Sequence, residues 1–207
     1  MPLSKIQTDI LRLLASQRDP ESYVADSTPL NRDYRFFPTM RDEMFGYVLH
    51  PVDLALNKVM AAAGRREVRD LVDLVAIHET IIPLGAAIWA AVEKAPGFTP
   101  EGLIAEIRRN SSYSPGAWRA LLTVEPLDPN AIMTRLRTAL DEAGAFVAQM
   151  PTDKAGLLFL KGGRAVQPDP SRLQDFQTHR GQRRGHWPLS SEISAAMFEH
   201  YRKPREE

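Results

Sequence analysis

The chain has 207 residues, of which 43% are hydrophobic, so it is long enough to bury a core as one large domain or as a small domain with an appendage. Its 26 basic and 26 acidic residues give a formal net charge of zero at pH 7, which argues against nucleic-acid binding by bulk charge. No cysteine is present, which excludes disulfide scaffolds, cysteine-based zinc sites and thiol nucleophiles.

Residues 1–50 are predicted to form one helix followed by a small sheet. Ser4 and Gln7 fit a capping box ahead of an apolar stripe, which predicts a helix from about residue 3 to residue 17. Asp19-Pro20 ends this pattern, and the segments beyond it favour short strands. The predicted strands are residues 22–25, 34–37 and 44–49.

Residues 51–150 are predicted to be helical, because proline and hydroxyl or carboxylate residues stand where helices start. The expected helices begin at Pro51, just after Gly64, at Pro83, at Pro100, at Pro115 and at Pro129. The first ends at Gly64, the fourth at about Arg109, and the last and longest at about Met150 before Pro151.

Residues 151–207 do not continue the helical pattern of residues 51–150. The apolar run 157–160, the glycine pair at 162–163 and Ala165-Val166 predict a β-hairpin, because paired glycines accept the positive φ angles of a tight turn. Residues 167–189 are predicted to be a polar connector, and Ser190 to cap a final helix. The fold class we expect is a predominantly helical α+β protein.

The densest polar cluster spans residues 53–73. Two short helices joined by a tight turn would bring Lys58 toward Arg65 and toward the carboxylates of the second helix. Lys58 and Arg65 could then donate to phosphate oxygens, while Asp70 or Asp73 orients them. On spacing alone, the commoner arrangement is a set of solvated ion pairs, with Arg66 pairing Asp70 and Arg69 pairing Asp73 at i,i+4.

A family resemblance covers most of the chain up to about residue 110. Residues 36–38 (FFP), 45–59 (FGYVLHPVDLALNKV), 64–65 (GR) and 69–74 (RDLVDL) resemble the segment that follows the catalytic core of AbiEii-type nucleotidyltransferase-like proteins, an abortive-infection toxin family. Residues 7–14 and 23–25 resemble the start of that family. The resemblance implies a nucleotidyltransferase-like fold and places Lys58 and Asp70 in the active region.

The chain departs from this family where the metal site should be. Such enzymes hold Mg²⁺ with an Asp-x-Asp pair beside a glycine-containing turn, and this chain has no Asp-x-Asp. The expected turn, residues 25–28, has no glycine, and residues 26–33 are all that separates it from the next strand. Asp19-Pro20-Glu21 is better interpreted as a loop. We therefore expect a remnant of the family's sheet, with its catalytic core segment deleted, no catalytic residue and no metal site.

A second candidate for phosphate or RNA contact is residues 179–187, which carry three arginines, two histidines and Trp187. One aromatic residue is a poor stacking platform, so a solvated connector is the favoured interpretation, and nucleic acid is a weakly supported partner. His50, His78 and His200 have no metal-ligand spacing and are expected to be caps or surface residues.

The leading functional hypothesis is a degenerate nucleotidyltransferase-like protein that retains weak nucleotide or phosphate binding at Lys58, Arg65 and Asp70, without a cofactor. One alternative is an active Mg²⁺-dependent enzyme of the toxin type with unidentified carboxylates. Another is a non-enzymatic interaction or antitoxin-like subunit that binds a second copy or a protein partner through surface exposed by the missing strands.

We expect no membrane partner and a cytoplasmic location. The N-terminus lacks the basic segment and apolar run of a secretory signal. The longest apolar run, residues 81–92, is interrupted by Pro83 and Gly85 and falls short of the roughly 20 residues of a transmembrane helix.

Overall fold

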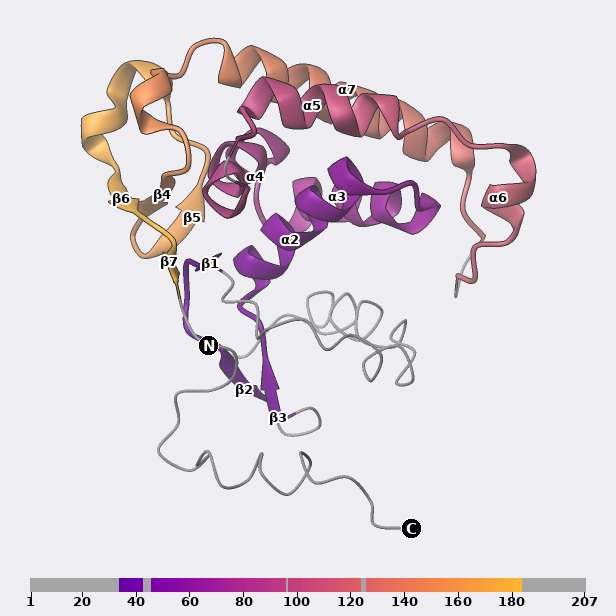
Figure 1. Cartoon of the computed structure of the whole chain (residues 1–207), viewed down its shortest axis with the longest axis horizontal. Helices are drawn as coiled ribbons and strands as arrows, with labels where there is room; N and C mark the ends of the chain where they lie inside the picture. Colours follow the sequence, from indigo (N-terminus) through magenta and orange to yellow (C-terminus); the bar gives the residue numbers. More distant parts are fainter. Residues whose placement is uncertain (1–33, 43–45, 96, 124–125, 184–207) are drawn as a thin grey trace. The chain divides into compact units, whose positions relative to one another are not determined.

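A computed structural model describes residues 34–42, 46–95, 97–123 and 126–183. These residues form a predominantly helical α+β fold with a three-stranded antiparallel sheet and further short strands (Figure 1). The helix predicted at residues 3–17, the strand at 22–25 and the helix after Ser190 lie outside the described residues.

The predicted helix starts are confirmed within one residue for five of the helices, because the capping residues act as expected. The helices are α2 (Pro51–Gly64), α3 (Val68–Thr80), α4 (Leu84–Ala91), α5 (Pro100–Arg109), α6 (Pro115–Arg119) and α7 (Pro129–Val147). Thr99, Ser114 and Asp128 each accept a backbone N–H in the first turn of the helix that follows. Helix α7 ends three residues earlier than expected.

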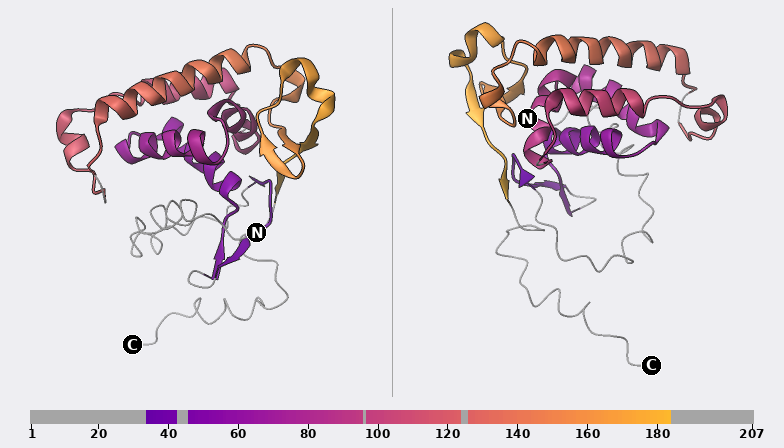
Figure 2. Two further views of the ribbon diagram at one scale, coloured as in Figure 1. Left: turned by 180° about the vertical axis from the view of Figure 1, so that it is seen from behind. Right: turned by 45° about the horizontal axis from the view of Figure 1, so that its top comes forward.

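The core lies among these helices. Helix α2 packs against α3, α4 and α5, and α7 packs against α3, α4 and α5. The two views of Figure 2 show α5 and α7 running side by side. All eight residues of α4 are buried, and Trp89 of α4 meets Phe146 of α7 edge to face. Helix α2 is thus held on three sides, which fixes the residues it carries.

In the described part of the chain, seven short strands accompany the helices. They are β1 (Tyr34–Arg35), β2 (Met40–Asp42), β3 (Gly46–Val48), β4 (Leu158–Lys161), β5 (Arg164–Val166), β6 (Gln177–His179) and β7 (Gln182–Arg183). The pairs β2–β3 and β1–β7 are antiparallel, and the larger sheet has the order β5-β4-β6. The predicted hairpin is confirmed: β4 and β5 pair, and Gly162 and Gly163 adopt φ angles of 57° and 76°.

The predicted connector is wrong over residues 167–183. This segment contains a 3₁₀ helix at Pro170–Asp175, strand β6 on β4 and strand β7 on β1. Strand β2 was also not predicted, and β1 is shorter than the predicted 34–37. The physical reason is that β6 and β7 are made by partners distant in sequence, which a local polar pattern does not reveal.

Within the described ranges, no single helix is both long and apolar enough to cross a membrane. One bent pair, α3 with the segment Leu84–Lys94, meets the length and composition test together across a 112° bend.

Candidate phosphate-binding cluster

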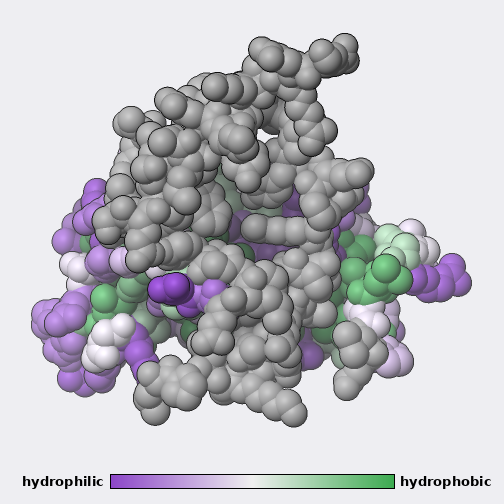
Figure 3. All heavy atoms as spheres, turned by 90° about the horizontal axis from the view of Figure 1, so that it is seen from below, coloured by the Kyte–Doolittle hydropathy of each residue, from purple (hydrophilic) through white to green (hydrophobic). Residues whose placement is uncertain are grey.

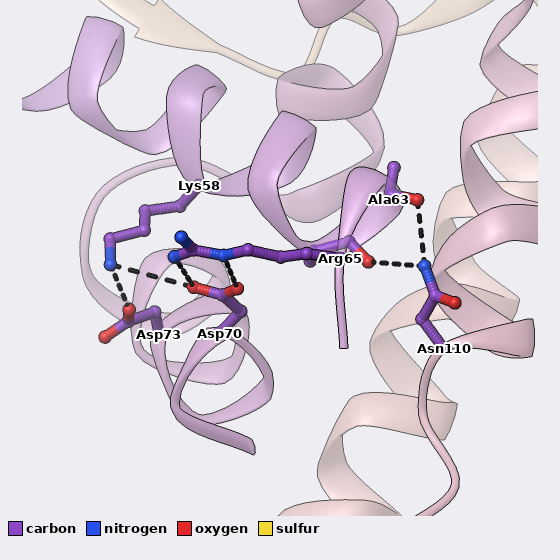
Figure 4. Close-up of polar contacts among 7 residues, drawn as sticks. Lys58, Ala63, Arg65, Asp70, Asp73 and Asn110 are labelled. Atoms are coloured by element: carbon purple, nitrogen blue, oxygen red, sulfur yellow. Dashed lines mark hydrogen bonds and ion pairs between the residues drawn. The ribbon is translucent and has the colours of Figure 1, made fainter. Parts of the chain in front are cut away.

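The three predicted site residues come from two packed helices and the turn between them. Lys58 lies on α2, Arg65 follows the end of α2, and Asp70 lies in the first turn of α3. Asp70 and Asp73 share the buried face of α3 with Leu74 and Ile77, so both carboxylates point toward α2 rather than to solvent. Figure 4 shows Lys58 reaching this pair of aspartates from above and Arg65 reaching Asp70 from the side.

One carboxylate joins the two basic side chains. Arg65 donates to both oxygens of Asp70, from Nε to Oδ2 at 2.9 Å and from Nη2 to Oδ1 at 3.1 Å (Figure 4). Lys58 Nζ lies 3.8 Å from Asp70 Oδ1 and 2.6 Å from Asp73 Oδ2. The structure therefore brings Lys58, Arg65 and Asp70 together, with Asp73 as a fourth member. We call these four residues the α2–α3 cluster.

The solvated ion pair expected between Arg66 and Asp70 is wrong. Asp70 is 1% exposed and binds Arg65 and Lys58 instead of Arg66. Helix α3 begins at Val68, so Arg66 lies outside the helix and i,i+4 spacing does not apply to it. Arg66 donates instead to the carbonyl of Ser112.

Burial separates the acids of the α2–α3 cluster from its bases. The side chain of Lys58 is 17% exposed and that of Arg65 is 47% exposed, whereas both carboxylates are buried. Burial raises the pKa of Asp73, an effect that the charge of Lys58 opposes. The hydrogen bond to Asp70 raises the pKa of Arg65. The cluster thus presents oriented cations outward over buried anions.

Asn110 fixes the helix end from which Arg65 projects. This buried side chain donates from Nδ2 to the carbonyl oxygens of Ala63 at 2.8 Å and Ala62 at 3.3 Å (Figure 4). The last carbonyls of α2 lack intrahelical partners, so this amide satisfies them. Sequence reasoning missed Asn110; its place directly after α5 was the available signal.

A second buried ion cluster lies nearer the start of α2. The carboxylate of Asp53 accepts the backbone N–H groups of Phe36 and Phe37, each at 2.9 Å. Lys94 Nζ lies 3.6 Å from Asp53 and donates to Asn57 at 2.8 Å. Asp53 is fully buried, and the side chain of Lys94 is 4% exposed. This Asp53–Lys94 cluster anchors the chain after β1 to α2, and sequence reasoning did not identify it.

The second candidate segment is partly built into the sheets. His179 Nε2 donates to the carbonyl of Phe36, and Gln182 and Arg183 pair with β1. A solvated connector is therefore wrong for residues 179–183, and residues 184–187 lie outside the described part of the chain.

The histidine caps are confirmed for two of the three residues. His50 Nδ1 accepts the Val52 N–H at 3.3 Å at the start of α2, and His78 Nδ1 accepts the Leu84 N–H at 3.1 Å at the start of α4. His200 is outside the described residues. Over the described ranges, no group of three or more histidine and carboxylate side chains could hold a metal ion.

Comparisons with known proteins do not assign the chain to a family. No protein-family model matches the chain, and no curated protein and no solved structure matches it either.

Proposed function

We propose that the chain is a nucleotidyltransferase-like protein that binds the phosphate groups of a nucleotide at Lys58, Arg65 and Asp70 without transferring the nucleotide. The observation that carries the proposal is the buried Asp70 carboxylate, which holds the guanidinium of Arg65 and lies beside the ammonium of Lys58. Two cations held on one acid form a fixed pair of donors. The resemblance of residues 45–59 and 69–74 to the AbiEii-type family supports the same assignment.

The donors that remain determine what the cluster can bind. Asp70 occupies Nε and Nη2 of Arg65, so Nη1 and the second hydrogen of Nη2 are left for a ligand. The Lys58 ammonium has three hydrogens, one of which is directed to Asp73. Phosphate oxygens suit both groups, because charge-assisted hydrogen bonds to phosphate are among the strongest that these side chains make.

The charge balance of the cluster predicts weak binding. Asp70 and Asp73 cancel the formal charge of Lys58 and Arg65. The net attraction for a phosphate is therefore only the difference between its attraction to the nearer cations and its repulsion by the more distant, buried anions. We expect a Kd of about 1 mM, or roughly −4 kcal/mol, for tripolyphosphate at low salt. Higher salt should weaken it further.

Nucleotidyl transfer requires groups that phosphate binding does not require. Two-metal phosphoryl and nucleotidyl transfer needs paired carboxylates that are free to coordinate, whereas Asp70 and Asp73 are already held by Arg65 and Lys58. The sequence offers no Asp-x-Asp in their place. Binding without transfer is the function that these residues support.

Two measurements test the proposal. Radiolabelled NTPs with Mg²⁺ and total cellular RNA should give no incorporation above background, and incorporation that is lost in Asp70→Ala would contradict it. Calorimetric titration with tripolyphosphate should give weak saturable binding that is lost in Lys58→Ala. Binding that is absent, or that is unchanged in this variant, would leave the cluster as structural ion pairs.

A further inference from the structure

A groove of about 660 Å³ lies between the segment after α5, helix α6 and the first turns of α7. Its lining is mainly apolar and includes Tyr113, Trp118 and Met133. Arg119 also lines the groove, and none of the described lining residues is acidic. Leu122, next to the lining residue Leu121, is 88% exposed. Figure 3 shows apolar surface beside hydrophilic surface at the end of the molecule where α6 lies in Figure 1.

Arg66 connects this groove to the α2–α3 cluster. It follows Arg65 directly in the chain, donates to the carbonyl of Ser112 and places its guanidinium carbon 5.8 Å from the centre of the Tyr113 ring. Burial raises the pKa of Tyr113, and the negative charge of Asp70 adds to this effect. Tyr113 therefore lines the groove and lies within electrostatic range of Asp70 in the α2–α3 cluster.

The lining of the groove suits a planar heterocycle. Aromatic side chains stack on any base, since every base has a π face, and such stacking contributes about tenfold or more to affinity for each base. Arginine at the edge of such a site adds charge and a planar stacking surface. Asn130 also lines the groove, and an asparagine side chain carries both a donor and an acceptor that suit the edge of a ring.

We propose that this groove binds the nucleobase of the nucleotide whose phosphates bind Lys58 and Arg65. The inference rests on the proposed function, because Arg66, which contacts Tyr113 of the groove, directly follows Arg65 of the α2–α3 cluster, and phosphate binding by that cluster would select a nucleotide over other apolar ligands. The groove volume falls within the range of about 300–1,000 Å³ typical of small-molecule sites.

The test compares ligands with and without a base on the full chain. Calorimetric titrations with ATP, GTP and tripolyphosphate should show that a nucleotide binds about tenfold more tightly than tripolyphosphate. In Trp118→Leu, this advantage should disappear while the affinity for tripolyphosphate stays the same. Trp118→Phe keeps an aromatic ring and should retain most of the advantage, which makes it the matched control.

The outcomes separate the two proposals. Equal affinity for ATP, GTP and tripolyphosphate in the unchanged protein, or an advantage that survives in Trp118→Leu, would overturn the nucleobase site and leave the phosphate site standing. Loss of tripolyphosphate binding in Lys58→Ala supports the proposed function independently of the groove. Concentration-dependent self-association in sedimentation, abolished by Trp118→Leu, would show that a second copy fills the groove and would also overturn the inference.

Discussion

Helix α2 contributes one residue, Asp53 or Lys58, to each of two lysine–aspartate clusters that have the same chemistry in different surroundings. In the Asp53–Lys94 cluster, both partners are almost completely buried, and Asp53 also accepts two backbone N–H groups. In the α2–α3 cluster, the carboxylates are buried but the side chains of Lys58 and Arg65 are 17% and 47% exposed. The two clusters therefore differ in the solvent access of their cations.

Because of this difference, we interpret the Asp53–Lys94 cluster as a structural anchor and the α2–α3 cluster as a candidate binding site. An ion pair removed from water adds little net stability by itself, but loss of one partner leaves the other charge buried and unpaired. An ion pair whose cations remain at the surface can hydrate when it is broken, and it can also offer its remaining donors to a ligand. We therefore predict that mutations in the Asp53–Lys94 cluster mainly lower stability, whereas mutations in the α2–α3 cluster mainly weaken binding.

The largest expected effect is that of Asp53→Ala. This change leaves Lys94 buried without its carboxylate and removes the acceptor of Phe36 and Phe37, so the free energy of unfolding should fall by about 3–5 kcal/mol. Urea unfolding followed by circular dichroism measures the change. If Asp53→Ala does not fold, Asp53→Asn, which keeps one acceptor, should fold and still lose stability. A loss below about 1 kcal/mol in either variant would remove the distinction between the clusters.

Asp70→Ala should destabilise less, by about 2 kcal/mol, because Arg65 can hydrate once its partner is lost. The same urea titration gives the value, and Asp141→Ala, which removes an exposed partner of Arg108, is the control with almost no effect. A loss equal to that of Asp53→Ala would show that the α2–α3 cluster is an anchor of the same kind.

Protonation of His50 at acidic pH should lower the stability of the protein at the start of α2. Burial lowers the pKa of His50 below its ordinary value of about 6.5, and Asp53 opposes this effect. The unfolded chain then takes up the proton first, so the free energy of unfolding falls as pH drops through 6.5 toward the folded pKa. In His50→Asn, which keeps a capping side chain, this part of the pH dependence should be absent from unfolding curves between pH 8 and pH 5. An identical pH profile would contradict the assignment.

The pH effect at Asp73 should be smaller and opposite in sign. Its pKa is raised in the folded protein, so the folded state holds the proton more tightly, and its contribution to stability is lost as pH rises from the ordinary aspartate value through the folded pKa. Carboxyl chemical shifts measured by NMR across pH 3 to 7 would give the midpoint directly. A midpoint at or below the ordinary value would show that Lys58 outweighs burial.

Local capping chemistry made most of the helical fold predictable. Prolines at positions 51, 100, 115 and 129 each begin a helix, and the glycine pair at 162–163 forms the expected turn. Strands β6 and β7 were not predictable in the same way, because their partners β4 and β1 lie elsewhere in the chain. Residues of low strand propensity become strands when tertiary pairing selects them.

The site was partly predictable for the same reason. A helix, a tight turn and a second helix bring Lys58, Arg65 and Asp70 together, which sequence spacing anticipated. The spacing rule failed for Arg66, because the helix begins two residues later. The roles of Lys94 and Asn110 depend on the packing of distant segments on α2, and no local pattern encodes that packing.

Calorimetric titration of tripolyphosphate into the Lys58→Ala variant tests the central claim most directly. Lys161→Ala, which removes an exposed lysine of the β4–β5 hairpin, is the matched control. The account predicts weak saturable binding to the unchanged protein and to Lys161→Ala, and none to Lys58→Ala that retains its helical circular dichroism. Equal binding to both variants, or no binding to the unchanged protein, would contradict it.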